Sequence, residues 1–231
     1  MHSQRSASVK SDSLDLGAFV RDLAHDIANP LNAMAMNAEL AKVLLDRGDQ
    51  AAARKALEHL LADCARCGRL VQSFQGFGAA LQASARERVA AGMLLQSAIS
   101  LMRGELPDAG IEFHVKGATD TQLDVDVPAV ERALAGILRN AAEAGATTIV
   151  IDIASGDDRR VRIDVADNGS GIEARWRERV MQPFFSTRRQ QGATGLGLAL
   201  AQEIVRRHAG SLRVMSTADH GTTVMLELPR S

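Results

Sequence analysis

Aromatic side chains are scarce in this sequence of 231 residues: tyrosine is absent, tryptophan occurs once, and aromatic residues make up 3% of the chain. A surface that stacks nucleic-acid bases is therefore not expected. An excess of charge of one sign is also lacking, because 27 basic residues are balanced by 28 acidic ones. Without a net basic field, neither nucleic acid nor an anionic membrane is expected as a partner. The two cysteines are too few for a disulfide framework and are typical of a reducing compartment.

Long hydrophobic runs are missing as well. The longest uncharged stretch suited to a helix, Val89–Met102, is too short and too polar to span a bilayer. The first residues contain no apolar core of the kind that a signal peptide needs, and the polar, serine-rich residues 1–12 are expected to be disordered. Hydrophobic residues still make up 46% of the chain, which is enough for a packed core. These features predict a cytoplasmic protein with no membrane insertion.

Two helical patterns occupy residues 13–85. In each, apolar or small residues recur every three or four positions, which places them on one face of a long helix. The first stripe is Leu16, Phe19, Leu23, Ile27, Leu31, Met34, Ala38 and Ala41, and the second is Leu57, Leu60, Cys64, Cys67, Val71 and Phe74. The polar run Asp46–Asp49 separates them, which predicts a helical hairpin. Since one hairpin cannot bury both stripes, we expect a homodimer that forms a four-helix bundle.

The helical pattern is lost at Gly76–Arg88, where we expect a linker. In residues 86–231 the apolar residues follow a different spacing, with strand-like and helical segments mixed. Alternating apolar residues predict strands at Ile111–Val115, Thr148–Ile153, Val161–Val165, Leu212–Ser216 and Thr223–Leu228. Helices are predicted at Pro128–Ala144, with Gly145 at the helix end, and at Leu196–His208. The last two strands are expected to form a hairpin. The expected fold is an α+β two-layer sandwich, in which helices cover one face of a mixed sheet.

His25 combines features of a reactive residue. The apolar stripe of the first helix leaves His25 on the solvent side, with Asp26 beside it and Asn29 one turn later on the same face. Pro30 follows inside the helix, where it removes a backbone hydrogen bond. A neutral imidazole is a competent nucleophile near neutral pH, and an adjacent carboxylate can fix its tautomer and take its proton. By itself, an exposed histidine beside an aspartate also fits an ordinary surface.

Two glycine-rich stretches in the second half have the character of ligand-binding loops. Asp167–Ile172 follows a predicted strand; its glycines permit close backbone approach to a ligand, and the carboxylate can accept a hydrogen bond from an amino group such as that of adenine. Gly192–Leu198 runs into a predicted helix, where free N–H groups and the helix dipole favour phosphate. Asn140 offers an uncharged oxygen that suits Mg²⁺ beside phosphates. Each glycine cluster alone also fits an ordinary turn.

In this order, the segments resemble the conserved boxes of the sensor histidine kinases of bacterial two-component systems, over residues 15–229. The matching segments are Phe19–Leu31 for the H-box, Ile137–Ala144 for the N-box, Val165–Ile172 and Gly192–Leu198 for the glycine boxes, and Pro183–Arg188 for the F-box. The resemblance implies a dimerisation and histidine-phosphotransfer hairpin, followed by an ATP-binding domain of the Bergerat (GHKL) type.

The resemblance also implies roles for individual residues. His25 is the implied phosphoacceptor, and Asp26 is implied to be its general base or the carboxylate that orients the ring. Asn29 is implied to take part in removing the phosphoryl group from the regulator. Asn140 is the implied Mg²⁺ ligand, and Asp167 is implied to recognise the N6 amino group of adenine. The implied ATP-binding residues are Asn140, Asp167, Gly169, Gly171, Ile172, Phe184, Thr194, Gly195, Leu196, Gly197 and Leu198, with residues 186–194 as a lid. ATP and Mg²⁺ are the implied cofactors, and the phosphoryl group passes to an aspartate of a response regulator receiver domain.

Two positions depart from the family pattern. The H-box usually carries Arg or Lys where this chain has Ala28, and the N-box usually begins with Asn where it has Gly136. In related mechanical ATPases, the position of Gly136 holds a Glu that activates water, so a mechanical ATPase is not expected. Two alternatives stay open: a histidine phosphotransfer adaptor with a degenerate ATP domain, and an anti-sigma-type serine kinase or binding protein. The intact glycine boxes argue against the first, and the H-box hairpin argues against the second.

Three further features complete the sequence interpretation. Few residues precede the hairpin, so we expect either a sensor-less kinase that takes its input from a separate sensor protein or a truncated catalytic core. Cys64 and Cys67 form a CxxC pair that invites a redox or metal interpretation. Both lie on an apolar stripe without two further zinc ligands, so we expect buried core cysteines. His208 ends a predicted helix, where a structural role is expected and a cation suits the dipole.

Overall fold

The computed structural model describes residues 16–81, 85–155, 159–188 and 193–231. The segment 1–12, predicted to be disordered, and part of the predicted lid lie outside the described residues. The chain divides into two compact units, one ending at Cys67 and one beginning at Gly68. In the described ranges, no helix combines the length and the apolar character that crossing a bilayer requires.

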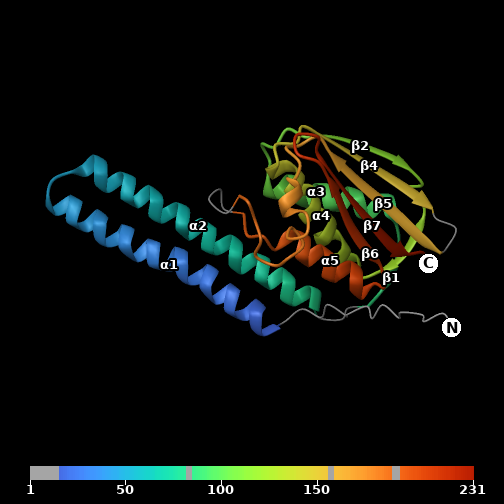
Figure 1. The fold of residues 1–231 in the computed structure, drawn as a ribbon, viewed down its shortest axis with the longest axis horizontal. Coiled ribbons are helices and arrows are strands. Elements are labelled where there is room, and N and C mark those ends of the chain that lie inside the picture. The colour runs from blue at the N-terminus through green and yellow to red at the C-terminus, as the bar shows by residue number, and fades with distance from the viewer. Residues whose placement is uncertain (1–15, 82–84, 156–158, 189–192) are drawn as a thin grey trace, which may run out of the picture. The chain divides into compact units, whose positions relative to one another are not determined.

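The predicted helical hairpin is present (Figure 1). Helix α1 spans Leu16–Asp46 and helix α2 spans Gln50–Leu81, so the break between them lies where the polar run predicts it. Gly48 makes the turn with a φ of 78°, a left-handed conformation that glycine adopts without steric penalty. The expected linker starts too early, because α2 continues through Gly76 to Leu81. A glycine inside a long helix costs about 1 kcal/mol relative to alanine and does not by itself end the helix.

Small residues dominate the buried part of the hairpin. The buried apolar residues of α1 and α2 are Leu23, Ala41, Ala53, Ala56 and Leu70. The two predicted stripes are only partly buried, since Leu31 is 51% exposed and Leu57 is 44% exposed. Cys64 is exposed and Cys67 is partly buried, so the expected burial of both cysteines is wrong for the single chain. Apart from Leu23 and Leu70, the buried apolar residues are alanines, and several larger apolar side chains remain exposed in the single chain.

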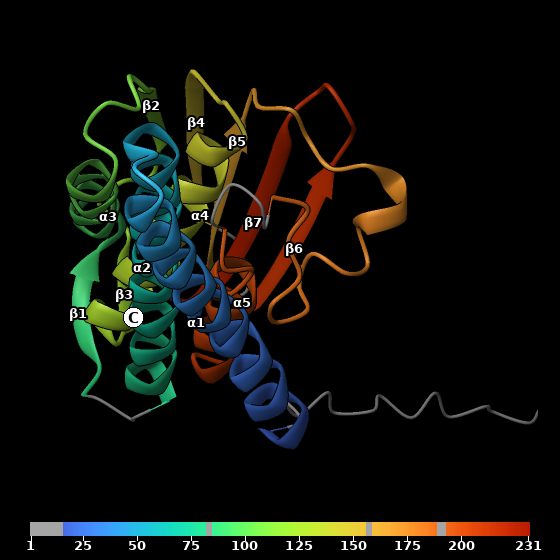
Figure 2. The ribbon, with the colours of Figure 1, turned by 90° about the vertical axis from the view of Figure 1, so that its left-hand side faces the viewer.

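A five-stranded mixed sheet forms the centre of the second unit, in the order β2-β4-β5-β7-β6 (Figure 2). Its strands are β2 Glu112–Gly117, β4 Thr148–Ser155, β5 Arg160–Asp167, β6 Ser211–Ser216 and β7 Thr222–Pro229. Strand β2 pairs in parallel with β4, and the remaining pairs are antiparallel. All five predicted strands are therefore confirmed, including the closing hairpin of β6 and β7.

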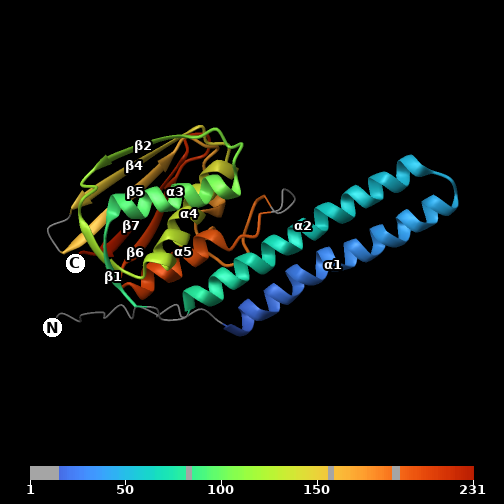
Figure 3. The same ribbon diagram turned by 180° about the vertical axis from the view of Figure 1, so that it is seen from behind.

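Three helices lie on one face of this sheet (Figure 3). They are α3 Ala91–Glu105, α4 Val127–Glu143 and α5 Gly197–Arg207. Alternate residues of β4 and β5 pack with them in one core: Ile149, Ile151, Ile153, Val161 and Ile163. Helices α4 and α5 match the predicted helices, and the uncharged run Val89–Met102 supplies most of α3. The predicted α+β two-layer sandwich is confirmed.

Two short strands that the sequence analysis missed form a second, two-stranded sheet. Strands β1, Glu87–Ala90, and β3, Gln122–Val125, pair antiparallel. A run of four residues is at the lower limit at which alternation indicates a strand. Strand β3 leads directly into α4, where the side chain of Asp126 accepts a hydrogen bond from the N–H of Ala129 at 3.1 Å and caps the helix.

Candidate functional site

The first candidate site lies on α1 around His25. The His25 side chain is 71% exposed, whereas the Asp26 side chain is 10% exposed. Nδ1 of His25 lies 3.2 Å from Nδ2 of Asn29 and 3.7 Å from Oδ1 of Asp26. Residues four apart on a helix are surface neighbours, which explains the contact with Asn29. Pro30 is buried inside α1. The structure therefore brings the three predicted residues of the H-box together at one ring nitrogen.

The second candidate site begins where β5 ends, at Asp167. Its Oδ1 accepts hydrogen bonds from the backbone N–H of Gly169 at 2.8 Å and of Thr222 at 3.2 Å. Burial raises the pKa of the Asp167 carboxyl, while these two hydrogen bonds and the nearby Arg188 guanidinium act in the opposite direction. The carboxyl group is thus held in one orientation, with one oxygen bound to the backbone.

The glycines after Asp167 make room for another segment of backbone. Gly171 has a φ of 67°, and a Cβ atom on it would overlap the carbonyl oxygen of Thr217 in the β6–β7 turn. The neighbouring N–H of Ile172 donates to Oγ of Ser216 at 2.8 Å. The glycines therefore let the loop lie directly against the β6–β7 hairpin. Their close approach to a ligand stays a prediction.

Helix α4 contacts both glycine boxes. At its end, the carbonyl oxygen of Ala144 accepts a hydrogen bond from the N–H of Ser170 at 3.0 Å, and a Cβ on Gly169 would lie 2.9 Å from Cβ of Ala144. One turn earlier, the side-chain amide of Asn140 would lie 3.2 Å from a Cβ on Gly197. The predicted N-box helix is therefore in contact with the first glycine box at one point and with the second at another.

The segment before α5 completes this site. Gly195 has a φ of 68° and lies against the backbone of Phe184, which is itself buried with a φ of 63°. The N–H of Leu196 lies 3.4 Å from Oγ1 of Thr194. Leu196 is buried and Leu198 packs against the core, so both leucines act in packing. Helix α5 begins without a side-chain cap, which leaves N–H groups of its first turn available to an anion.

Arg188 adds a positive charge beside Asn140. Its Nη2 donates to the backbone carbonyl oxygen of Asn140 at 3.4 Å. Its Nη1 is buried and has no hydrogen-bond partner among the residues that the structure describes. A guanidinium N–H in this state is suited to a phosphate oxygen. The F-box match contained Arg188, but nothing in the sequence showed that it lies against Asn140.

Sequence reasoning missed Ser216 and Thr222 as parts of the site. Oγ of Ser216 donates to the carbonyl oxygen of Gly221 at 2.8 Å and lies 2.9 Å from Oγ1 of Thr222. Thr222 reaches Asp167 because the register of β5 against β7 places the two residues opposite each other. The predicted β6–β7 hairpin was the one available signal, and it does not reveal its pairing with β5.

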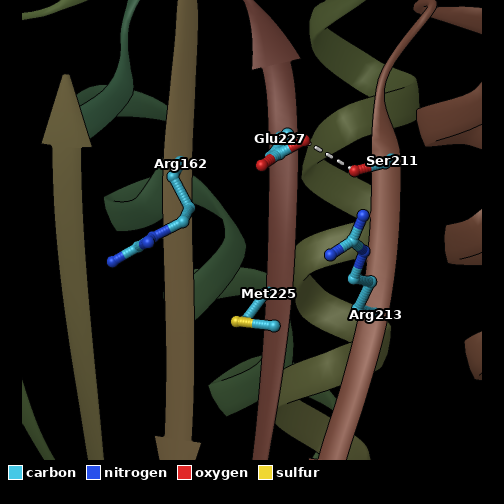
Figure 4. A pocket seen from close by; sticks show the side chains of 5 residues that line it. All are labelled: Arg162, Ser211, Arg213, Met225 and Glu227. Carbon is cyan, nitrogen blue, oxygen red and sulfur yellow. Dashed lines mark hydrogen bonds between the residues drawn. The ribbon is translucent and has the colours of Figure 1, made fainter. Parts of the chain in front are cut away.

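A shallow hollow on the sheet face opposite the helices is separate from these residues (Figure 4). It is lined by Arg162, Ser211, Arg213, Met225 and Glu227. Ser211 donates to Glu227 at 2.8 Å, and Arg162 pairs with Asp164 at 3.1 Å. The hollow contains none of the predicted ATP-binding residues, so it is not part of the candidate site.

The two cysteines of α2 are free thiols. Sγ of Cys64 donates a hydrogen bond to Sδ of Met34 on α1, at 3.0 Å. Burial raises the pKa of the Cys67 thiol, and Cys64 and Asp63 raise it further. A thiol with a raised pKa is a weak nucleophile, so Cys67 lacks the character of a catalytic cysteine.

Comparison with known families decides the identity of these two units. Residues 15–78 match the family model of the His Kinase A (phospho-acceptor) domain, and residues 125–231 match that of the histidine kinase-, DNA gyrase B-, and HSP90-like ATPase. The chain belongs to the two-component histidine kinases. The resemblance drawn from the H, N, F and glycine boxes is thereby confirmed.

Several histidine kinases align with most of this chain. It is 27% identical over 217 residues to the signal transduction histidine-protein kinase AtoS of Escherichia coli K12, an alignment that covers 93% of this chain and 35% of AtoS. It is 29% identical over 222 residues to the sensor-like histidine kinase SenX3 of Mycobacterium tuberculosis H37Rv, covering 91% of this chain and 53% of SenX3. The chain thus spans from about a third to a half of the length of these curated relatives.

Solved structures of histidine kinases share the fold. The mycobacterial sensor histidine kinase MprB is 27% identical with a TM-score of 0.55, over 63% of this chain and 97% of that one. Histidine kinase ThkA, solved in complex with the response regulator protein TrrA, has a TM-score of 0.73 over 94% of this chain and 62% of that one. At 19% identity, the likeness to ThkA shows a common fold.

Proposed function

We propose that the chain is an ATP-dependent histidine autokinase of a two-component signalling system and that His25 is its phosphoacceptor. The observation that supports this best is the arrangement at His25. Its ring is exposed, and Nδ1 faces Asp26 and Asn29, which leaves Nε2 on the other side of the ring to receive a phosphoryl group. The histidine kinase domains that match both units support the same activity.

The nucleophilic nitrogen must be unprotonated, so the ring proton has to reside on Nδ1. Because the amide nitrogen Nδ2 of Asn29 only donates, its contact with Nδ1 belongs to the other tautomer, and the Asn29 amide turns to present its oxygen when His25 attacks. Oδ1 of Asp26 lies 3.7 Å from that nitrogen, and a small rotation of either side chain would bring the two within hydrogen-bond distance. The carboxylate then favours the Nδ1–H tautomer and stabilises the positive charge that develops on the ring during attack. Asp26 acts in this proposal as a positioning residue for His25.

We assign nucleotide binding to the site around α4. Oδ1 of Asp167 is bound to two backbone N–H groups, so Oδ2 is the atom assigned to accept from the adenine amino group. The first turn of α5 and Nη1 of Arg188 are assigned to the phosphates. The side-chain oxygen of Asn140 lies beside this helix N-terminus and suits Mg²⁺, which takes oxygen ligands from protein, water and phosphates. When bound, Mg²⁺ neutralises charge on the phosphates.

The proposed reaction is a phosphoryl transfer in two steps. Nε2 of His25 attacks the γ-phosphorus of ATP, a P–N bond forms, the bond from that phosphorus to the β–γ bridging oxygen breaks, and ADP leaves. A carboxylate oxygen on the response regulator's aspartate then attacks the same phosphorus, and the P–N bond breaks to restore neutral His25. Positioning and charge neutralisation supply most of the catalysis in such transfers. Asn29, 3.2 Å from the ring, is assigned to orient water when the kinase dephosphorylates its regulator.

We further propose that two chains pair through their hairpins. Large apolar side chains remain exposed on both helices: Leu31 (51%), Leu40 (50%), Leu57 (44%), Leu61 (65%) and Val71 (44%). Full burial of an exposed side chain of this kind is favourable by about 1.5–3 kcal/mol, so covering the exposed half of each contributes about half as much, and a four-helix bundle of two hairpins covers them. The domain boundary is proposed at residues 85 and 86. Since ATP and response regulators are cytoplasmic, we propose that these domains act in the cytoplasm.

The test is to incubate the purified chain with γ-labelled ATP and Mg²⁺ beside two variants, His25→Gln and His59→Gln. His59 is an exposed histidine on α2 and serves as the matched control. We expect acid-labile, alkali-stable label on the wild type and on His59→Gln, and no label on His25→Gln, with equal nucleotide binding in all three. Equal labelling of His25→Gln would rule out its proposed role.

A follow-up variant separates a weak kinase from the phosphotransfer adaptor. If no chain takes up label although all three bind ATP, the next chain to test is Gly136→Asn, which restores the usual N-box residue. Label on Gly136→Asn supports the proposed mechanism and identifies Gly136 as the cause of low activity. No label on any chain, or no ATP binding at all, contradicts the autokinase assignment.

A further inference from the structure

Two sulfur atoms of the helical hairpin are in contact, and a third sulfur-bearing residue follows on the same helix face. Sγ of Cys64 on α2 lies 3.0 Å from Sδ of Met34 on α1. Cys67 follows Cys64 by three residues on the same helix, and residues three apart on a helix are neighbours on one face, with Cβ atoms about 5–6 Å apart. All three residues belong to the unit that ends at Cys67. Two thiols and one thioether are therefore carried by neighbouring positions of the two helices.

Packing alone does not account for this set. The buried contact between α1 and α2 is made largely by alanines, namely Ala41, Ala53 and Ala56. Cys64 instead is exposed, and Cys67 and Met34 are only partly buried. In the single chain the three side chains are consequently open to solvent at least in part, while a helical framework holds them.

The donor set selects the kind of ion. Thiolate and thioether sulfur are soft ligands, which prefer Cu(I) among the common biological metals. A structural zinc site would need four ligands from Cys, His, Asp or Glu. The described residues contain no group of three or more such side chains that could hold a metal ion. A site with two cysteines and one methionine is therefore poor for Zn²⁺ and suited to Cu(I).

We propose that Met34, Cys64 and Cys67 bind one Cu(I) ion within each hairpin. On binding, each thiol releases its proton to solvent and coordinates as a thiolate, the Met34 thioether coordinates as a neutral donor, and copper stays in the +1 state. The ion links α1 to α2 and restrains their relative movement. Met34 lies on the same helix as His25, about 14 Å further along it at ~1.5 Å per residue, so the bound ion stiffens the helix that presents His25.

The test is an anaerobic titration of the full chain with Cu(I) in competition with a coloured Cu(I) chelator. The variants are Met34→Leu, Cys64→Ser and Cys67→Ser, and the control is Met36→Leu, which removes a methionine that is 75% exposed on the same helix. We expect one Cu(I) per chain in the wild type and in Met36→Leu. Each of the other three variants should bind at least about tenfold more weakly, a loss typical of removing a supporting group from a metal site.

Three results would overturn the proposal. Unchanged affinity in Met34→Leu would remove the thioether from the site, and one copper per two chains would place the ion between copies instead of within a hairpin. Tighter binding of Zn²⁺ than of Cu(I), with each ion titrated alone, would contradict the soft donor set. Circular dichroism of each variant shows that the hairpin is intact. The titration needs neither ATP nor phosphorylation, so its outcome is independent of the proposed kinase activity.

Discussion

The backbone N–H of Asp126 donates a hydrogen bond to Nε2 of His208 at 2.9 Å, across 82 residues of sequence. Because a backbone N–H only donates, Nε2 carries no proton, and Nδ1 is the nitrogen that donates to the carbonyl oxygen of Ile204 at 2.7 Å. The ring is 4% exposed. His208 thus joins the end of α5 to the start of α4 as a neutral imidazole. Its expected structural role is confirmed.

We predict that His208→Ala lowers the free energy of unfolding by about 1–3 kcal/mol, because it leaves the partly buried N–H of Asp126 without its partner and removes the side-chain hydrogen bond to the carbonyl oxygen of Ile204, which keeps its bond from the backbone N–H of residue 208. His208→Gln should recover part of the loss, since its amide oxygen can reach the position of Nε2. Urea unfolding monitored by Trp176 fluorescence measures this directly, because Trp176 is the only tryptophan and lies in the same unit. Exposed His220 supplies the control, and His220→Ala should change stability by less than about 0.5 kcal/mol.

Asp167→Asn should separate nucleotide binding from stability. The amide oxygen of Asn can still accept from the N–H groups of Gly169 and Thr222, but its amide nitrogen donates where the adenine amino group needs an acceptor. ATP affinity should therefore fall about tenfold to hundredfold, the value of a hydrogen bond to a charged group. Nucleotide titration of both chains measures the loss. Asp152→Asn, at a carboxylate that is 45% exposed, is the control and should bind ATP as the wild type does.

The same substitution predicts a pH dependence with a definite sign. Burial raises the pKa of Asp167 in the folded chain, so its ionisation opposes folding. The contribution of Asp167 to stability therefore falls as the pH rises from the unfolded-state pKa to the raised folded-state pKa. At neutral pH, Asp167→Asn should be at least as stable as the wild type, and this advantage should disappear near about pH 3, where both side chains are neutral. Urea unfolding at the two pH values measures the stability advantage of Asp167→Asn over the wild type. A larger advantage in acid than at neutral pH would contradict a raised pKa for Asp167.

Gly171→Ala should damage the domain more than Gly145→Ala does. Both glycines have positive φ, 67° and 77° respectively, so each substitution carries a conformational cost of about 1–2 kcal/mol. A Cβ on Gly145 meets no atom within 4 Å, whereas one on Gly171 overlaps the Thr217 carbonyl oxygen. Urea unfolding should show the larger loss at Gly171, with weaker ATP binding because the loop after Asp167 must move. Equal losses would mean that backbone strain alone requires glycine there.

Gly136→Ala should stabilise the domain by about 0.5–1 kcal/mol, because glycine inside a helix loses more backbone entropy on folding than alanine. The added Cβ would lie 3.8 Å from the carbonyl oxygen of Gly197, an ordinary contact. Gly197→Ala is the contrasting variant, since its Cβ would lie 3.2 Å from the Asn140 amide and should displace that side chain. Urea unfolding and nucleotide titration together distinguish the two, and a destabilised Gly136→Ala would show that α4 and α5 are packed more closely there than the contact distance indicates.

Local patterns predicted most of the regular structure. Strand β5, Arg160–Asp167, was predicted as Val161–Val165, because one face of the strand is buried and apolar residues alternate along it. Helix α4 was predicted within one residue at each end, because Pro128 and Gly145 mark its ends. Strands β1 and β3 were missed, since each has four residues and becomes a strand through pairing with the other. The end of α2 was misplaced, because Gly76 and Gly78 weaken a helix without stopping it.

By itself, the sequence determined the order of the chemical motifs, the helical spacing that places Asn29 beside His25, and the class of the fold. These follow from neighbours along the chain, where periodicity and turn residues act directly. Only the tertiary structure decided that Thr222 donates to Asp167, that Arg188 lies against Asn140, and that Met34 meets Cys64. Such contacts depend on strand register and helix packing between distant segments, and many combinations of side chains allow the same register. The partners of each functional group are therefore set by the folded chain, while the groups themselves are visible in the sequence.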